Sequence, residues 1–215
     1  MLLFDIGANI GNWTLANIGD NKIICVEASP TTFEKLIHNV QNKGNIIPLN
    51  YAVSDVSTDT VIFYESNSNI LSTLDKKWLE DSRSRFGINS PFGGYVPHKE
   101  INVKTITLDK LITTYGIPDL LKIDVEGAEN IVLRSLTSKA KLICFEWASE
   151  WNVETIECID HLVKIGYNQF HVQNQDTYNY RPNEFEHTSS SIKDYLRSTT
   201  PMVEWGMIWS TYSPY

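Results

Sequence analysis

Residues 2–13 read LLFDIGANIGNW, and this stretch decides how the rest of the chain is interpreted. An apolar run ends in Asp5, Gly7 and Gly11 then bracket a tight turn, and a helix-compatible segment follows. Glycines lack a Cβ, so a ligand can approach the main chain closely at such a turn. The pattern predicts a strand, a glycine turn and a helix start that hold a nucleotide-like ligand. The alternative is an ordinary strand-to-helix turn that happens to contain glycines.

Length and composition indicate a single globular domain over residues 1–215. Hydrophobic residues make up 42% of the chain, and the net charge is -8 with scattered Lys and Arg residues, which disfavours a nucleic-acid partner. No apolar run approaches the roughly 20 residues that span a bilayer. The N-terminus lacks signal-peptide features, and the three cysteines have no metal-site spacing, so we expect a soluble, cytoplasmic protein without a membrane span.

Short β-rich runs alternate with helical stretches along most of the chain. Several of the runs are almost continuously apolar, as expected for strands covered on both faces. The alternation predicts an α/β fold with a doubly wound, mostly parallel sheet. The expected strands are 2–6, 22–27, 45–49, 120–124, 141–146, 169–173 and 205–210, and the expected helices are 12–18, 30–41, 128–136 and 153–165.

Two polar segments with many aromatic residues, 66–102 and 174–202, interrupt this alternation. Segments of this length inside a compact domain are usually either disordered or functional. Their aromatic content favours folding, because aromatic rings need burial or a ligand. We expect inserted lid or substrate segments, with simple surface packing as the alternative.

An acidic residue, Glu27, follows Asp5 by 22 residues, at the end of the second expected strand. An acid at about this distance accepts hydrogen bonds from ribose hydroxyls in nucleotide-binding α/β folds. The turn itself departs from the dinucleotide fingerprint, because Asn9 stands where the middle glycine belongs. This argues against NAD or FAD, whereas S-adenosylmethionine fits a looser turn, with Asp5 facing its ammonium or sulfonium side.

A second acidic block, DLLKIDVEGAE at 119–129, carries Asp124 to the end of a strand and Glu126 into the next turn. Ligands bind at this edge in open α/β sheets. Asp124 and Glu126 are therefore candidates for a general base, metal ligands or acceptors of substrate hydroxyls. For Glu129 we expect only a favourable interaction with the helix N-terminus.

The motifs DIGANIG, VEASP, YAVSD, VKTITLDKL and LKIDVEGAE, in this order, resemble the FkbM-type family of S-adenosylmethionine-dependent methyltransferases. The resemblance implies the seven-stranded, Rossmann-like class I methyltransferase fold with an antiparallel last strand. It also implies O-methylation of a hydroxyl on a sugar, glycolipid or secondary metabolite, with S-adenosylmethionine converted to S-adenosylhomocysteine. The cofactor contacts expected on this basis are Asp5, Gly7, Ala8, Asn9, Gly11, Asn12, Glu27, Ala28, Ala52, Val53 and Asp124.

Asp124 is the first choice of base for removing the hydroxyl proton, and Glu146 is the second. Alternatively, Asp124 and Glu146 hold a divalent cation that lowers the pKa of the hydroxyl. The expected substrate contacts are Glu126, Trp147, Trp78, His98 and His171, although Trp147 is equally explained by packing and a lone histidine is more often structural.

The predicted function is an O-methyltransferase that modifies a hydroxyl of a sugar, glycan or glycosylated metabolite. The alternatives are an inactive S-adenosylmethionine-binding regulatory module and a methyltransferase for another small molecule. A nucleic-acid methyltransferase ranks low because the turn after 120–124 reads DVEG rather than N/D-P-P-Y. Homo-oligomerisation is left open.

Overall fold

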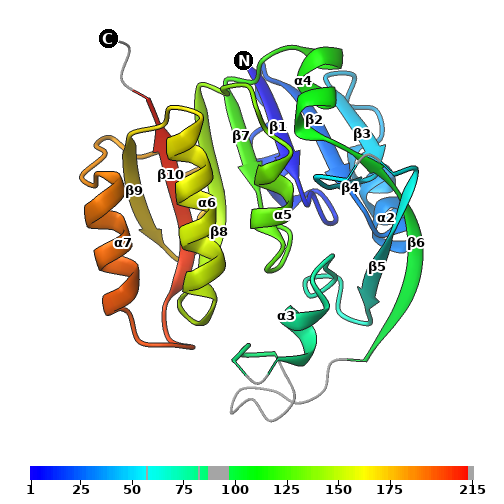
Figure 1. Ribbon diagram of the computed structural model, residues 1–215. Coiled ribbons are helices and arrows are strands. Elements are labelled where there is room, and N and C mark those ends of the chain that lie inside the picture. Colours follow the sequence, from blue (N-terminus) through cyan, green and yellow to red (C-terminus); the bar gives the residue numbers. More distant parts are fainter. Residues whose placement is uncertain (57, 82, 87–96, 213–215) are drawn as a thin grey trace.

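The computed structural model describes residues 1–56, 58–81, 83–86 and 97–212. Its centre is a seven-stranded sheet with the order β3-β2-β1-β7-β8-β10-β9 (Figure 1). All neighbouring pairs are parallel except those of β10, which is antiparallel to both β8 and β9. The α/β class, the doubly wound parallel sheet and the antiparallel last strand are therefore confirmed. The sheet strands are β1 (Leu2–Ile6), β2 (Lys22–Glu27), β3 (Ile46–Asn50), β7 (Leu120–Ile123), β8 (Leu142–Ala148), β9 (Gln169–Asn174) and β10 (Trp205–Thr211).

Helices cover both faces of this sheet (Figure 1). One face packs against α4 (Leu108–Tyr115), α5 (Glu129–Arg134), α6 (Asn152–Lys164) and α7 (Ser189–Ser198), and the other against α1 (Asn12–Ala16) and α2 (Pro30–Val40). Successive side chains of β1 point to opposite faces of the sheet. Phe4 packs in the core under α4–α7, and Leu3 packs in the core under α1 and α2. A single 3-10 turn, η1 (Ser149–Trp151), precedes α6.

Cap residues in the sequence explain where several helices begin. The Ser29 side chain accepts a hydrogen bond from the Thr32 backbone and Pro30 occupies the first helical position, so α2 starts there. Thr107 caps α4, and Thr188 forms a capping box with Ser191 at the start of α7. No helix of the described ranges is long and apolar enough to traverse a bilayer.

A small second sheet stands beside the carboxyl ends of the main strands. It has the order β4-β6-β5, formed by β4 (Ala52–Val53), β5 (Thr60–Ser66) and β6 (His98–Ile106). β5 and β6 pair antiparallel, from Thr60 opposite Lys104 to Ser66 opposite His98. The expected segment 66–102 is thus the far end of a β-ribbon, with α3 (Lys76–Glu80) between its strands. Its residues 82 and 87–96 lie outside the described part.

The expected segment 174–202 divides into two parts. Residues 189–198 form α7, whose Ile192 and Leu196 are fully buried in the main core. Tyr180 and Phe185 pack on the opposite face of the sheet, beside the core that contains Trp13 and Trp209. The first part of this segment therefore lies on the same side of the sheet as α1.

Candidate active site

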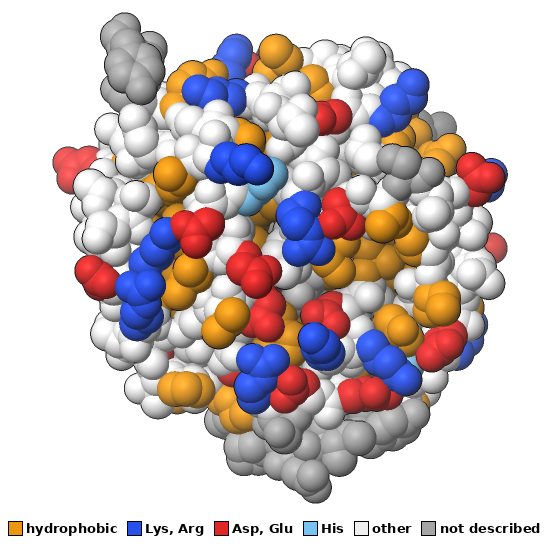
Figure 2. All heavy atoms as spheres, in the orientation of Figure 1, with side chains coloured by type: hydrophobic (Ala, Val, Ile, Leu, Met, Phe, Trp, Pro, Cys, Tyr) orange, Lys and Arg blue, Asp and Glu red, His pale blue; other side chains and the backbone are white. Residues whose placement is uncertain are grey.

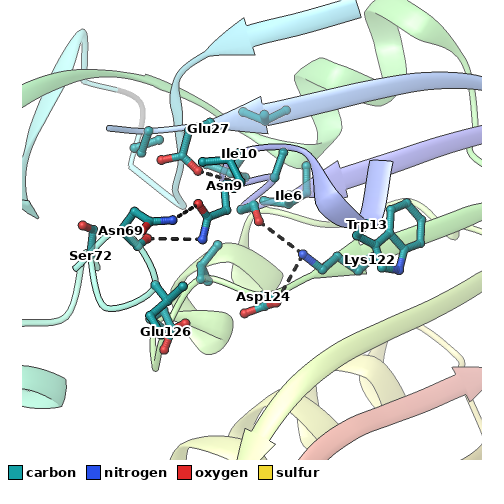
Figure 3. A pocket seen from close by; sticks show the side chains of 18 of the residues that line it. Ile6, Asn9, Ile10, Trp13, Glu27, Asn69, Ser72, Lys122, Asp124 and Glu126 are labelled. Carbon is teal, nitrogen blue, oxygen red and sulfur yellow. Dashed lines mark hydrogen bonds and ion pairs between the residues drawn. The ribbon is translucent and has the colours of Figure 1, made fainter. Parts of the chain in front are cut away.

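A cavity of about 410 Å³ opens at the carboxyl ends of β1, β2 and β7 (Figure 3). The glycine turn, the end of β2, β4 and the turn after β7 all contribute to its wall, as do residues of the two inserted segments. Its polar or sequence-predicted lining residues are Gly7, Ala8, Asn9, Asn12, Glu27, Ala28, Ala52, Val53, Asn69, Ser72, Lys122, Asp124, Glu126, Asp176 and Tyr178. Most of the expected cofactor contacts are therefore gathered around one space.

The glycine turn is fixed against the neighbouring strands by its backbone. The amides of Gly7 and Ala8 both donate to the Val26 carbonyl oxygen, at 3.0 and 2.9 Å. Gly7 has a φ of +75°, and a Cβ there would lie 1.7 Å from the Asp124 carbonyl oxygen. Only glycine therefore lets the β1 turn and the end of β7 approach this closely. Gly11 does not line the cavity; it lies between the turn and Leu36 of α2.

Glu27 is held at the cavity wall by two backbone amides. One carboxylate oxygen accepts from the Asn9 amide at 2.9 Å and the other from the Ser29 amide at 2.8 Å. Burial raises the pKa of Glu27 to about 7 despite these hydrogen bonds. Because a carboxylate has about four lone-pair sites, each oxygen can still accept one hydroxyl.

A buried lysine that the sequence reasoning missed, Lys122 of β7, joins the two acidic motifs. Its Nζ lies 3.1 Å from Asp5 and donates to the Gly7 carbonyl oxygen at 3.2 Å. The same atom lies 3.3 Å from Asp124 (Figure 3). Burial alone would lower the pKa of Lys122, but Asp124 and Asp5 outweigh it and keep that pKa above the usual range. The ammonium is therefore a permanent positive charge in the cavity wall. A charged residue in the apolar run LLKI was the available signal.

Asp5 lies beneath the cavity and is not among its lining residues. It is fully buried, accepts a hydrogen bond from the Thr14 hydroxyl at 2.6 Å, and faces Lys122. The expected contact of Asp5 with the ligand's positive side stays a prediction, and in the structure Lys122 rather than Asp5 lines the cavity.

Three carboxylates, Asp124, Glu126 and Glu146, come together where β7 and β8 end. Each offers an oxygen atom that lies within 4.8 Å of the other two, a spacing at which a divalent cation can be held. Burial first, and then the neighbouring carboxylates, raise the pKa values of Glu126 and Glu146 well above normal. Such a group of carboxylates can accept a proton or share a cation.

A second cavity, of about 560 Å³, adjoins the first, and Ile70 and Glu126 line both. Trp78 and Glu146 belong to its wall, together with the exposed residues Val203 and Trp205. The carboxylate cluster therefore stands at the junction of two spaces, one against the glycine turn and one under the inserted segment.

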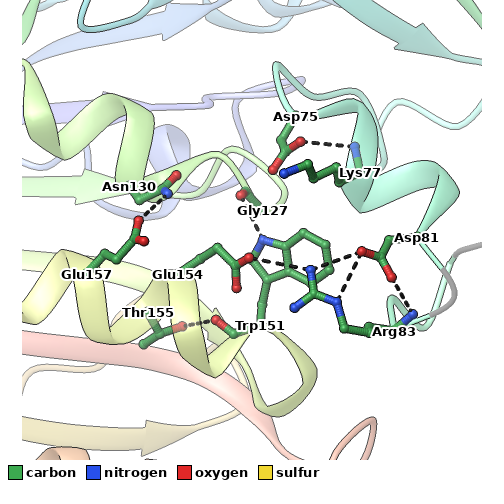
Figure 4. Close-up of polar contacts among 10 residues, drawn as sticks. All are labelled: Asp75, Lys77, Asp81, Arg83, Gly127, Asn130, Trp151, Glu154, Thr155 and Glu157. Atoms are coloured by element: carbon green, nitrogen blue, oxygen red, sulfur yellow. Dashed lines mark hydrogen bonds and ion pairs between the residues drawn. The ribbon is translucent and has the colours of Figure 1, made fainter.

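The segment before residue 87 is anchored beside this junction by charged contacts (Figure 4). Arg83 pairs with Asp81 at 3.0 Å and with Glu154 at 3.6 Å, and its guanidinium lies 5.0 Å from the Trp151 ring. Trp151 in turn donates from Nε1 to the Gly127 carbonyl oxygen at 3.2 Å. These contacts tie α3 to η1, α6 and the turn after β7.

Three of the expected substrate residues are not brought to either cavity. Trp147 is 2% exposed and packs edge-on against Tyr195, because it points to the opposite face of β8 from Glu146. His98 lies 3.6 Å from Glu80 and packs against the Tyr64 ring. His171 is held between Glu186, at 2.6 Å, and the Tyr180 hydroxyl, at 2.5 Å.

The sheet order and the glycine turn beside the acidic ends of β2 and β7 define a class I methyltransferase fold. A family model for the methyltransferase FkbM domain matches residues 5–192. The chain belongs to the FkbM methyltransferase family, which confirms the resemblance of its motifs.

A curated relative, the hexuronic acid methyltransferase AglP of Haloferax volcanii, is 28% identical over 147 residues. The match covers 67% of this chain and 53% of AglP, so the chain spans about half the length of this relative. Among solved structures, precorrin-6y C5,15-methyltransferase from Geobacter metallireducens is 11% identical with a TM-score of 0.48, covering 99% of this chain and 80% of that chain. Aeropyrum pernix fibrillarin with bound S-adenosyl-L-methionine is 15% identical with a TM-score of 0.41, covering 98% and 65%.

Proposed function

We propose that the chain is an S-adenosylmethionine-dependent O-methyltransferase that acts on a hydroxyl of a sugar or glycan. The observation that carries the proposal is the pair of adjoining cavities that meet at Asp124, Glu126 and Glu146. Two substrates must meet for methyl transfer, and the carboxylates lie where they would meet. Membership of the FkbM family supports the reaction class, and the name of AglP supports a sugar as acceptor.

The first cavity offers bare backbone, a hydrogen-bond acceptor and an apolar surface that suit S-adenosylmethionine. The turn at Gly7 leaves room beside bare backbone, and Glu27 offers free lone pairs to the two ribose hydroxyls. Ala52 and Val53 present a buried apolar surface suited to the adenine ring. Asp124 lines the same cavity and can face the positively charged methyl-donor side of the cofactor.

When bound, the cofactor supplies an electrophilic methyl group on a sulfonium. The protein must then hold the acceptor oxygen in line with the methyl group and take its proton. S-adenosylmethionine would supply the methyl group and leave as S-adenosylhomocysteine, and a carboxylate of the protein would take the hydroxyl proton.

Asp124 is the proposed base, because Lys122 fixes its position at 3.3 Å and it lines the cofactor cavity. Glu146 is the second candidate, on the acceptor side. The same carboxylates can instead hold a divalent cation that acidifies the hydroxyl.

The test is transfer of a labelled methyl group from S-adenosylmethionine to a panel of sugars and glycans. We expect Asp124→Asn to lower kcat by about 10²- to 10⁴-fold, the usual contribution of a general base. The exposed Asp20→Asn variant serves as the matched control and should keep wild-type turnover. Full turnover by Asp124→Asn would remove the proposed base, and loss of turnover with a metal chelator would favour the cation. Cofactor binding without any transfer would indicate the regulatory module instead.

A further inference from the structure

We propose that Asp176, in the segment after β9, binds the α-ammonium group of S-adenosylmethionine. The inference deepens the proposed function and rests on it, since it assigns one group of the cofactor to one residue of the first cavity. Asp176 and Tyr178 both line this cavity, although neither belongs to the glycine turn or to the acidic ends of β2 and β7. A segment outside the recognised motifs therefore helps to form the first cavity.

The backbone is anchored on both sides of Asp176. On one side, the Gln175 amide donates to the Trp205 carbonyl oxygen at 2.8 Å, at the start of β10. On the other side, the side-chain amide of Asn17, which directly follows α1, donates to the Tyr178 carbonyl oxygen at 3.0 Å. These contacts hold Asp176 between the sheet and α1.

The Arg181 side chain strengthens the second anchor. Its Nη2 donates to Asn17 Oδ1 at 2.6 Å, and its guanidinium lies 5.9 Å from the Trp13 ring and 5.6 Å from the Trp209 ring. Trp13 itself lines the first cavity. Because the backbone around Asp176 is held at both ends, a ligand that binds its carboxylate has little chain to immobilise.

The Asp176 carboxylate has no partner within the part of the chain that the structure describes. It is half-buried, and it takes part in no hydrogen bond or ion pair between described residues. Burial raises the pKa of Asp176, the nearby Asp124 raises it further, and Lys122 acts in the opposite direction. Asp176 therefore lies towards the Asp124 side of the cavity. An ammonium group there would donate charge-assisted hydrogen bonds to a carboxylate that otherwise lacks them.

The positive groups of the cofactor outnumber the carboxylates that the motifs supply on this side. S-adenosylmethionine carries a sulfonium and an α-ammonium group, and Asp124 can face only the sulfonium side. Lys122, the basic residue among the described lining residues, already faces Asp5 and Asp124, at 3.1 and 3.3 Å. On the outer face in Figure 2, by contrast, Lys and Arg side chains lie among the Asp and Glu side chains. Asp176 is thus a carboxylate left for the second positive group.

The test measures how Asp176→Asn changes the affinity for three ligands that differ in their charged groups. S-adenosylmethionine has the sulfonium and the ammonium, S-adenosylhomocysteine keeps the ammonium alone as a positive group, and methylthioadenosine has neither. We expect Asp176→Asn to weaken binding of the first two by about 10- to 100-fold, the usual contribution of a hydrogen bond to a charged group, and to leave the third unchanged. The exposed Asp20→Asn variant is the matched control and should bind all three as the wild type does.

The other outcomes each overturn the inference. Weaker binding of S-adenosylmethionine alone would assign Asp176 to the sulfonium, and an equal loss for methylthioadenosine would indicate a change of the whole cavity. Unchanged affinity for all three ligands would leave Asp176 without a role in cofactor binding. Failure of the folded wild-type protein to bind any of the three would instead contradict the proposed function.

A comparison in the wild-type protein tests the inference even if the variant fails to fold. S-adenosylhomocysteine is compared with its deaminated analogue, in which a hydrogen atom replaces the α-ammonium group. We expect the deaminated compound to bind about 10- to 100-fold more weakly, because it leaves the carboxylate of Asp176 without a donor. Equal affinity of the two compounds would overturn the inference.

Discussion

The buried ammonium of Lys122 offers the sharpest test of how the site is built. Its side chain is 4% exposed and pairs with Asp5, which is fully buried, and with Asp124. Lys122→Met keeps the apolar stem but leaves the Asp5 carboxylate buried without a counter-ion. Removing one partner of a buried ion pair typically costs about 3–5 kcal/mol. For a domain of this size each kcal/mol lowers the Tm by about 2–4 °C, so we expect a loss of roughly 6–20 °C.

Urea and thermal unfolding followed by circular dichroism measure this loss. The matched control is Lys141→Met, since Lys141 pairs with Asp119 at 2.6 Å on the surface and is 67% exposed. An exposed pair of this kind contributes less than about 1 kcal/mol. The double variant Asp5→Asn/Lys122→Met should recover part of the stability, because it removes the stranded charge. Equal stability of the two single methionine variants would refute the reasoning.

Two further predictions concern the cofactor cavity. Gly7→Ala should lower the free energy of unfolding by about 2–5 kcal/mol, because the alanine would be strained at positive φ and would collide with the Asp124 carbonyl group. Gly19→Ala, with φ +32° and no atom within 4 Å of the added Cβ, should lose only the part due to strain. Urea unfolding measures both losses, and equal losses would contradict the prediction. Burial raises the pKa of Glu27 to about 7, and the ribose hydroxyls donate hydrogen bonds to its charged form. The affinity for S-adenosylmethionine should therefore decrease by up to about tenfold for each pH unit below 7, because Glu27 becomes protonated there. Above pH 7 the affinity should become constant. Titrations of Glu27→Gln should lack this dependence, and an unchanged profile in that variant would exclude Glu27 as its source.

The main sheet could be predicted from sequence because its strands are continuous apolar runs. All seven expected sheet strands and all four expected helices are present, with ends shifted by two residues or fewer. The turn at Gly7 and the acid Glu27 meet at one cavity because parallel strands end at the same edge.

The β-ribbon and the later helices were not predicted. β5 and β6 are half exposed, and they pair across more than thirty residues of intervening chain, so neither strand carries a local signal of its partner. α7 begins in a run of polar residues, and only the capping pattern at Thr188 marked it. The short α4 was not predicted either, although Thr107 caps its first turn.

The candidate site, too, could be predicted only in part. Backbone-determined positions such as Asn9 and Glu27 follow from the motif, whereas side-chain positions depend on packing. Strand alternation alone separates Trp147 from Glu146, and the sequence reasoning did not apply it. His171 satisfies its ring nitrogens with Glu186 and Tyr180, contacts that only the folded chain reveals.

The most direct test of the account is isothermal titration of S-adenosylmethionine into the wild-type protein. We expect one binding site for each chain, with an affinity that Gly7→Ala strongly weakens and Gly19→Ala leaves unchanged. No binding to folded wild-type protein would contradict the central claim that the cavity between β1, β2 and β7 holds the methyl donor.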